Sequence, residues 1–297
     1  MNTFVSDLVR TATSFNTYLL GLIMGGIYAL ISMGLSIQYG VAKILNISHG
    51  EFIMVGAFLT WGLVMAGVHP VLALIICCPF ILVVGFVLHR TLFKRLKDAS
   101  PLPAVFESNA MLLAFGLMFV VQNIGSRIWG ANPTGYTFMA YPVDIAGHPF
   151  AANRLFVLGF AIVISALFYL FLLKTRLGKS IRAAAQDPAA ASLMGIKINT
   201  VMAICFGIGT MLAGIAGSLL TMIQPSYTTM GMGYTVTAII VVVLGGLGSV
   251  PGSLIGGVIL GVVGTVVTTI EPSLTIVVYY LIIMVLLIVR PKGLLGR

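Results

Sequence analysis

Long apolar segments follow one another along nearly the whole chain and are separated by short polar loops. A run of about 20 mostly apolar residues is long enough to cross a membrane as a helix. Residues 198–270 carry no charge, so further spans are expected there, separated at Gly231, Gly233 and the run 245–253. The first of these covers residues 201–223, and the other candidate spans cover residues 17–37, 48–67, 71–88, 108–126, 155–173 and 274–289. The pattern predicts an all-α polytopic membrane protein of about eight to ten transmembrane helices, with about nine favoured, in a single domain over residues 1–297.

The composition supports this class and excludes others. The chain is 59% hydrophobic and only 8% charged, whereas soluble domains carry about 25% charged residues. So few charges cannot cover the surface of a soluble domain of this length. The net charge of +9 comes from basic residues in the short loops, which is typical of membrane topology. No basic and aromatic surface long enough to follow a phosphate backbone is present, so nucleic acid is excluded as a partner.

The basic residues also predict the orientation of the chain. All but three of its 16 lysine and arginine residues fall at position 43, in residues 90–97, in residues 174–197 or after residue 289. Cytoplasmic loops of membrane proteins are enriched in these residues. We therefore expect a multi-pass membrane protein with its N-terminus outside and its first apolar run retained as an uncleaved helix. Arg10, Arg127 and Arg154 would lie on the outer side.

The sequence ILNISHGEFIMVGAF, residues 44–58, places polar and ionisable side chains between two apolar spans. Ionisable groups inside a membrane are costly and mark transport paths or buried pairs. Gly50 permits a break in the helix near residues 40–51, Glu51 would favour the positive end of the next helix, and Asn46 or Ser48 is a candidate cap. One interpretation is that the turn lines the translocation path near its cytoplasmic end and moves during gating. The other is that its polar residues only hold the turn together. The residues concerned are Asn46, Ser48, His49, Gly50 and Glu51.

Other candidates for the path lie further along the chain. Gln122 and Asn123 fall in the fourth span, where adjacent amides usually face protein or water, and Thr235 begins the seventh. The loop 130–153 is rich in aromatic residues and would lie outside. It is interpreted either as an interfacial aromatic belt or as a docking surface for a binding protein. Glycines spaced four apart (Gly21 and Gly25, Gly252 and Gly256, Gly257 and Gly261) predict close helix packing.

Motifs for enzymatic, nucleotide or metal chemistry are incomplete. The triplet Gly178-Lys179-Ser180 lacks the glycine that a phosphate-binding loop needs five residues earlier, because that position is Leu173. The four histidines do not have the spacing of a helical zinc motif. An intramembrane hydrolase that uses His49 and Glu51 remains an alternative, but it lacks an evident nucleophile. No cofactor or metal is therefore expected to be bound by this chain.

The segment 174–199 differs from the other loops. It is rich in alanine, Asp187-Pro188 is a start signal for a second short helix, and five cations flank an apolar patch that includes Leu193 and Met194. One interpretation is an amphipathic helix resting on lipid headgroups. The other is a cytoplasmic docking helix that inserts into a groove on a partner.

Three motifs together resemble a known family: LNISHGEFIMVGAF, RAAAQDPAAASLMGI and VVLGGLGSVPGSLIGG. The chain resembles the inner-membrane permeases of branched-chain amino acid ABC importers, with the urea and amide importer permeases as close relatives. The resemblance implies a permease without its own ATP site, two cytoplasmic ATPase subunits that bind ATP and Mg, and a periplasmic solute-binding protein. It also implies a second permease subunit, for which a paralogue is favoured and a second copy of this chain stays open. Gln186 stands near where this family often has a glutamate.

The resemblance assigns the segment 174–199 to coupling with the ATPases. The coupling residues it implies are Arg182, Ala184, Gln186, Asp187, Ala190, Leu193 and Gly195. The expected function is therefore alternating-access import, without covalent chemistry, of a branched-chain or other hydrophobic amino acid. Two alternatives stay open: an ABC permease for urea, amides or small organic acids, and a secondary transporter that works alone.

Overall fold

The computed structural model describes residues 14–145 and 147–296. Arg10, which the orientation argument used, and Arg297 lie outside the described residues. The helices are α2 (Phe15–Ala42), α3 (His49–Met65), α4 (Pro70–Leu88), η1 (His89–Phe93), α5 (Lys94–Ala99), α6 (Pro103–Trp129), α7 (Ala152–Lys174), α8 (Arg176–Gln186), α9 (Pro188–Leu193), α10 (Ile198–Leu220), α11 (Met230–Gly245), α12 (Val250–Ile270), η2 (Pro272–Leu274) and α13 (Thr275–Val289).

The helical membrane class is confirmed. In the described part of the chain, 7 helices are long and apolar enough to cross a membrane: α2, α4 with its continuation to Ala99, α6, α7, α10, α12, and η2 with α13. The apolar helices α3 and α11 are shorter, with 17 and 16 residues. The strands β1 (Pro142–Ile145) and β2 (His148–Ala151) form an antiparallel hairpin that the all-α prediction did not include.

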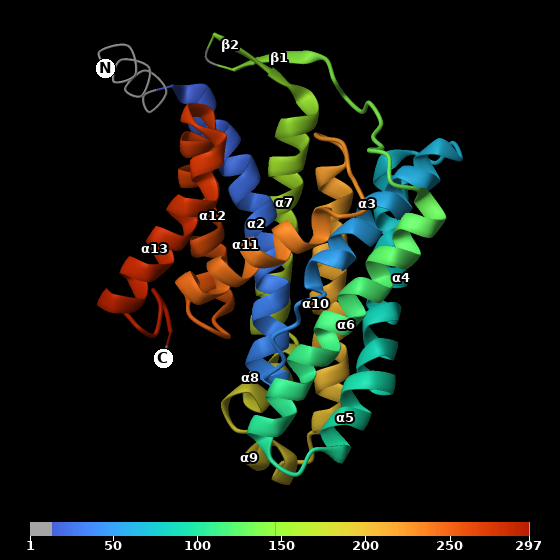
Figure 1. Cartoon of the computed structure of the whole chain (residues 1–297), viewed down its shortest axis with the longest axis vertical. Helices are drawn as coiled ribbons and strands as arrows, with labels where there is room; N and C mark the ends of the chain where they lie inside the picture. Colours follow the sequence, from blue (N-terminus) through green and yellow to red (C-terminus); the bar gives the residue numbers. More distant parts are fainter. Residues whose placement is uncertain (1–13, 146, 297) are drawn as a thin grey trace.

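The basic loops gather at one end of the bundle. Figure 1 shows α5, α8 and α9 at one end, and the β1–β2 hairpin with the start of α2 at the other. The end with α5 and α8 carries the described residues of the basic segments 90–97 and 174–197. We call it the cytoplasmic end and the opposite end the outer end.

Glycines let the central helices approach one another at backbone distance. A Cβ atom at Gly257 of α12 would lie 2.6 Å from the Cα of Ala29 on α2, and one at Gly25 would lie 2.9 Å from the Cα of Val258. On α10, a Cβ at Gly207 would lie 2.7 Å from the carbonyl oxygen of Leu82 on α4. Such contacts exclude any larger residue without a shift of the backbone. The packing role predicted for the four-residue glycine spacing is confirmed for α2 and α12.

Helix α3 begins half-way along α2 and runs toward the outer end. Its first residue, His49, lies against the middle of α2, where His49 Nε2 is 2.9 Å from the carbonyl oxygen of Ile31. The preceding residues 43–48 are not helical, and they return from the cytoplasmic end of α2 to this level (Figure 1). The predicted break near residues 40–51 is therefore present. It brings the polar turn to mid-depth, deeper than the cytoplasmic end of the path where the sequence placed it.

Helix α11 is the second short apolar helix and crosses the middle of the bundle obliquely (Figure 1). It begins beside the start of α3, and the loop that follows it packs on Gly40 near the cytoplasmic end of α2, where a Cβ would lie 3.4 Å from Gly248. The C-terminal segment holds this end of α11, because the amides of Leu294 and Leu295 donate to the carbonyls of Leu244 and Gly245 at 2.9 and 3.1 Å. Helices α3 and α11 are therefore both short; α3 rises toward the outer end, α11 crosses the middle of the bundle obliquely, and their N-terminal ends meet there (Figure 1).

Candidate functional site

The N-terminal ends of α3 and α11 are joined by a hydrogen bond. The amide nitrogen of Gly50 donates to Oγ1 of Thr235 at 2.8 Å, and this hydroxyl donates to the carbonyl oxygen of Gly231 at 3.1 Å. Amides in the first turn of a helix have no partner within that helix, so Thr235 satisfies one of the free donors of α3. The structure thus brings together two of the sequence-predicted path residues from opposite ends of the chain.

Position 50 must be glycine because no side chain fits there, and not because its backbone conformation favours glycine. A Cβ at this position would overlap the carbonyl oxygen of Gly231 and the hydroxyl of Thr235. Gly50 lies within the first turn of α3 and is not among the glycines with positive φ. The sequence interpretation, in which the flexibility of Gly50 permits the break, is therefore wrong, because Gly50 lies within α3 and not in the break. The residue at the break with a left-handed backbone is Lys43, with φ of 55°.

Glu51 lies fully buried between the two helix ends. It is in the first turn of α3, and a Cβ at Gly231 in the first turn of α11 would lie 2.6 Å from its carboxyl carbon. Neither carboxylate oxygen has a hydrogen-bond partner among the described residues. The N-terminus of a helix carries a partial positive charge, so two such ends favour a negative group here. Half-length helices that point their N-termini at anionic groups are a recurring feature of transporter sites.

A second set of polar contacts fixes the turn before α3. Oδ1 of Asn46 accepts from the amide and the hydroxyl of Ser48 at 3.1 and 2.6 Å. The Asn46 amide donates to Gln38 on α2 at 3.3 Å, and Gln38 in turn donates to the carbonyl oxygen of Phe206 on α10 at 3.1 Å. Ser48 occupies the N-cap position without a side-chain capping bond, so neither candidate cap acts as predicted. These contacts support the interpretation in which the polar residues hold the turn together.

Gln38 is a member of this network that the sequence interpretation missed. It is fully buried and is the single amide side chain between residues 17 and 45. Buried polar groups in a membrane protein need partners, so an isolated glutamine in an apolar run is the signal that would have found it.

His49 is buried against α2 and takes no part in an acid–base pair with Glu51. Its Nε2 atom contacts the carbonyl oxygen of Ile31, and Nδ1 has no hydrogen-bond partner in the described part of the chain. The structure forms no hydrogen bond between these two described residues. This geometry gives no support to the hydrolase alternative, which needs the two groups to act on a common atom.

Gln122 and Asn123 form no hydrogen bond to the junction of α3 and α11 among the described residues. Both are on α6, where Asn123 is exposed and donates to the carbonyl oxygen of Phe119 in its own helix at 2.8 Å. No hydrogen bond links either residue to Glu51 or Thr235 among the described residues. The structure therefore does not bring these two predicted path residues into the same cluster.

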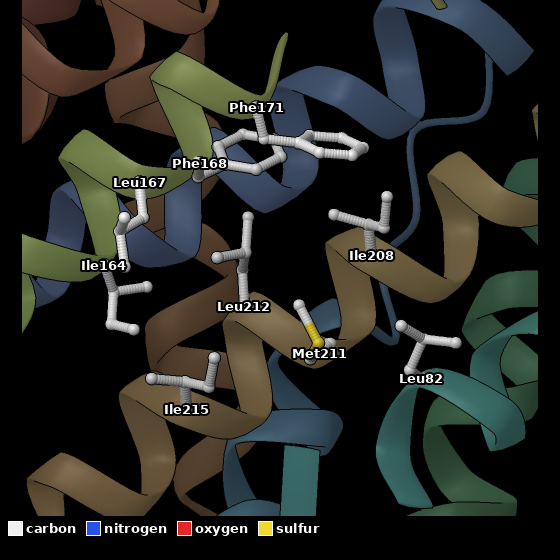
Figure 2. A pocket seen from close by; sticks show the side chains of 9 residues that line it. All are labelled: Leu82, Ile164, Leu167, Phe168, Phe171, Ile208, Met211, Leu212 and Ile215. Carbon is white, nitrogen blue, oxygen red and sulfur yellow. The ribbon is translucent and has the colours of Figure 1, made fainter. Parts of the chain in front are cut away.

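A separate hollow of about 340 Å³ lies between α4, α7 and α10 (Figure 2). Its lining is entirely apolar: Leu82, Ile164, Leu167, Phe168, Phe171, Ile208, Met211, Leu212 and Ile215. An amino acid carries an ammonium and a carboxylate, and sites for such ligands place a few polar groups to hold them. This hollow offers none, so we do not assign it to the substrate.

The segment 174–199 folds as a hairpin of two helices, α8 and α9, at the cytoplasmic end. The hydroxyl of Thr175 caps α8 by accepting from the amide of Gly178 at 2.9 Å, and Arg182 donates to the carbonyl oxygen of Leu172 at the end of α7. Asp187 caps α9 by accepting from the amides of Ala189 and Ala190 at 2.8 and 3.0 Å. The predicted helix start at Asp187-Pro188 is confirmed.

The tip of this hairpin presents an apolar pair to its surroundings. Leu193 is 90% exposed and Met194 is 84% exposed, and Gly195, with φ of 84°, ends the hairpin. Of the predicted coupling residues, six are accessible: Arg182, Gln186, Asp187, Ala190, Leu193 and Gly195. Ala184 is only 1% exposed because it lies on the inner face of α8. Ala184 is therefore not on the accessible surface of the hairpin, and its role in coupling stays a prediction.

Comparison with known proteins places this architecture in a family. The model of the family described as "Branched-chain amino acid transport system / permease component" matches residues 17–289. The high-affinity branched-chain amino acid transport system permease protein BraD of Pseudomonas aeruginosa is 30% identical over 292 residues, which cover 93% of this chain and 94% of BraD. LivH of Escherichia coli K12, which carries the same description, is 29% identical over 303 residues with the same coverage.

More distant similarity extends to sugar permeases. The fructose import permease protein FruG of Bifidobacterium longum is 28% identical over 225 residues, which cover 71% of this chain and 64% of FruG. No solved structure matches the chain. The family match covers all the described spans except the first two residues of α2. The chain is a multi-pass inner-membrane protein. It belongs to the family of permease components of branched-chain amino acid transport systems.

Proposed function

We propose that the chain is the permease subunit of an ABC importer that moves a branched-chain amino acid across the inner membrane. The observation that carries the proposal is the exposed apolar pair Leu193–Met194 on the capped hairpin α8–α9. Leucine and methionine side chains that protrude from a rigid helical tip suit insertion into a groove on another protein. A secondary transporter that works alone has no use for such a surface on its cytoplasmic side.

The proposal assigns the chemistry of ATP to other subunits. Two cytoplasmic ATPase subunits would bind ATP and Mg, and this chain would bind no cofactor and catalyse no covalent step. A periplasmic binding protein would deliver the amino acid to the outer end, where the loop that precedes β1 and the loop near Ser226 lie together. The amide of Thr134 donates to the carbonyl of Ser226 at 2.9 Å, which supports a continuous outer surface. A second permease subunit would complete the path.

Movement of the hairpin would reach the junction at mid-depth through α10. Helix α8 contacts α10, and α10 packs on α3, where a Cβ at Gly217 would lie 3.0 Å from the Cα of Ile53. Because a tightly packed interior has few voids, a displacement of α10 would move the backbone of α3 with it. A tilt of α10 would therefore separate or close the N-terminal ends of α3 and α11.

Glu51 is the residue that we assign to gating at this junction. Separation of the two helix ends would expose its carboxylate to the path, and closure would bury it again. A neutral, zwitterionic solute can pass such a site, because its ammonium would meet the carboxylate and its carboxylate would meet the amides of the helix ends. ATP binding can shift the equilibrium only if the ATPases bind the two states with different affinity.

The test is ATP-dependent uptake together with the recovery of partners. The complex would be isolated from membranes in mild detergent, reconstituted in vesicles and supplied with ATP, binding protein and radiolabelled leucine. Leu193→Asp is expected to abolish uptake and the recovery of ATPases. Leu102→Asp, at an exposed leucine of the same cytoplasmic end, is the matched control and should retain both. Uptake by the purified chain without ATP would instead establish a secondary transporter.

A further inference from the structure

The outward face of α6 differs chemically from those of the other peripheral helices. The strongly exposed side chains on α4, α7 and α13 within the bundle are hydrophobic, as in Ile76, Leu167 and Met284, and apart from the tyrosine hydroxyls they carry no polar group. Helix α6 instead exposes the amide side chains of Asn109 and Asn123. A side-chain amide that faces lipid leaves its donors and acceptors without partners, which is costly.

The two asparagines flank a glycine on the same side of the helix. Asn109, Gly116 and Asn123 are seven residues apart, which is close to two helical turns and places them on one face. Gly116 is exposed, and nothing lies within 4 Å of the position that a Cβ would occupy there. Packing within this chain therefore does not require a glycine at position 116. The opposite side of α6 is the one that packs on α3, where a Cβ at Gly125 would lie 2.8 Å from Met54.

We infer that the face of α6 formed by Asn109, Gly116 and Asn123 is the contact surface for a membrane helix of the second permease subunit. Small residues at the centre of a membrane helix interface allow the backbones to approach, and flanking amides form interhelical hydrogen bonds. Asn123 donates one amide hydrogen to Phe119 in its own helix, so its carbonyl oxygen and second hydrogen are free for the partner. The inference rests on the proposed function, which supplies the second subunit.

The partner is a related chain rather than a second copy. Arg127 lies on the same face, eleven residues after Gly116, and is exposed. Two copies inserted in the same orientation, with this face on their two-fold axis, would pack α6 against α6 in parallel and place the two Arg127 side chains opposite each other. Like charges across an interface are unfavourable. A non-identical subunit avoids this repulsion if a neutral or acidic residue of that subunit lies opposite Arg127. Its hydrogen-bonding side chains would lie opposite Asn109 and Asn123.

The first experiment fills the glycine at the proposed contact. Gly116→Leu adds a side chain where this chain leaves open space, so its fold and melting temperature should be unchanged. The recovery of the second permease with this chain should fall about tenfold, the loss expected when a close interhelical contact is removed. Gly159→Leu is the matched control, because Gly159 is also exposed on a peripheral helix with nothing within 4 Å. Equal recovery with the two variants would overturn the inference.

The second experiment identifies what covers the face. A photo-crosslinking phenylalanine analogue at Leu112, which is 70% exposed on this face, should give an adduct with the second permease in the membrane. The same analogue at Phe80, exposed on α4, should give none. An adduct with a second copy of this chain, or no adduct at Leu112, would overturn the inference. So would modification of Leu112→Cys by a membrane-impermeant charged thiol reagent, since the face would then line a water-filled path.

These outcomes separate the inference from the proposed function. If the ATPases and a second permease are recovered with the unsubstituted chain while α6 gives no adduct, the proposed function stands and the contact lies on another face. If neither is recovered, the proposed function fails and the inference fails with it.

Discussion

The backbone amide of Gly50 donates a 2.8 Å hydrogen bond to the hydroxyl of Thr235, although 185 positions separate the two residues. This bond ties the first turn of α3 to the first turns of α11 in the middle of the bundle. Both helices are short, with 17 and 16 residues, and their free N-terminal amides would otherwise be buried without partners. The contact therefore stabilises the N-terminal ends of both short helices. A displacement of one end would also displace the other.

Gly50→Ala is expected to disrupt this junction. The added methyl group would overlap the carbonyl oxygen of Gly231, a backbone atom that cannot rotate away, and overpacking of this kind costs about 1–3 kcal/mol. We expect a lower melting temperature in detergent and a loss of leucine uptake. Gly62→Ala on the same helix is the control, because nothing lies within 4 Å of a Cβ there. Equal melting temperatures for the two variants would contradict the proposed close approach.

Thr235→Val tests the hydrogen bond separately from the packing. Valine keeps the shape of threonine but leaves the buried amide of Gly50 unpartnered, at a cost of about 1–3 kcal/mol. Thr235→Ser retains the hydroxyl and should lose much less stability. Thr237→Val is a further control, since the Thr237 hydroxyl bonds only to Gly233 in its own helix at 3.0 Å. Hydrogen exchange at the Gly50 amide and thermal unfolding provide the measurements. Equal protection of that amide in the Val and Ser variants would count against the bond.

Features that depend on neighbouring residues were predictable from the sequence. The apolar runs follow from the need to bury backbone polar groups within each helix. The start of α9 at Asp187-Pro188 follows from local capping chemistry. The glycine spacing in 252–261 identified a packing surface because only small residues permit backbone contact. Each of these signals lies within a few residues of the structure that it specifies.

Features that depend on distant segments were not predictable in the same way. The pairing of Gly50 with Thr235 and the mid-depth position of the turn follow from where α2, α3 and α11 cross, which no local pattern records. The burial of Ala184 likewise depends on which face of α8 meets α2 and α10. Alanine occurs on both faces of this helix, so its composition does not distinguish the inner side from the accessible one.

Glu51→Ala is expected to abolish uptake while the protein still inserts and assembles. The substitution removes the carboxylate that lies between two helix N-termini, where a negative group is favoured. Glu51→Gln keeps the size of the side chain and separates the effect of charge from that of volume. Glu107→Ala, at an exposed glutamate near the cytoplasmic end of α6, is the control and should transport normally. Uptake of radiolabelled leucine and co-purification of the ATPases are the readouts. Unchanged uptake in Glu51→Ala would leave the residue without a role in gating.

Asp187→Ala is expected to weaken coupling without affecting insertion. Helix α9 has only 6 residues, and so short a helix is unstable without support. Asp187 supplies part of this support by accepting from the amides of Ala189 and Ala190, a cap worth about 1 kcal/mol. Its loss would let the tip that carries Leu193 and Met194 unfold, and a change of this size alters an equilibrium about fivefold.

The measurement for this variant is stimulation of ATP hydrolysis by the binding protein in the reconstituted complex. Asp187→Asn keeps an oxygen that can accept the same two hydrogen bonds and should restore most of the stimulation. The melting temperature of the transmembrane part should be the same in both variants, because Asp187 is exposed and its side-chain oxygen bonds only within the hairpin. If Asn fails as completely as Ala, the carboxylate is needed for a charge contact with the ATPase, and the capping explanation of this residue is wrong.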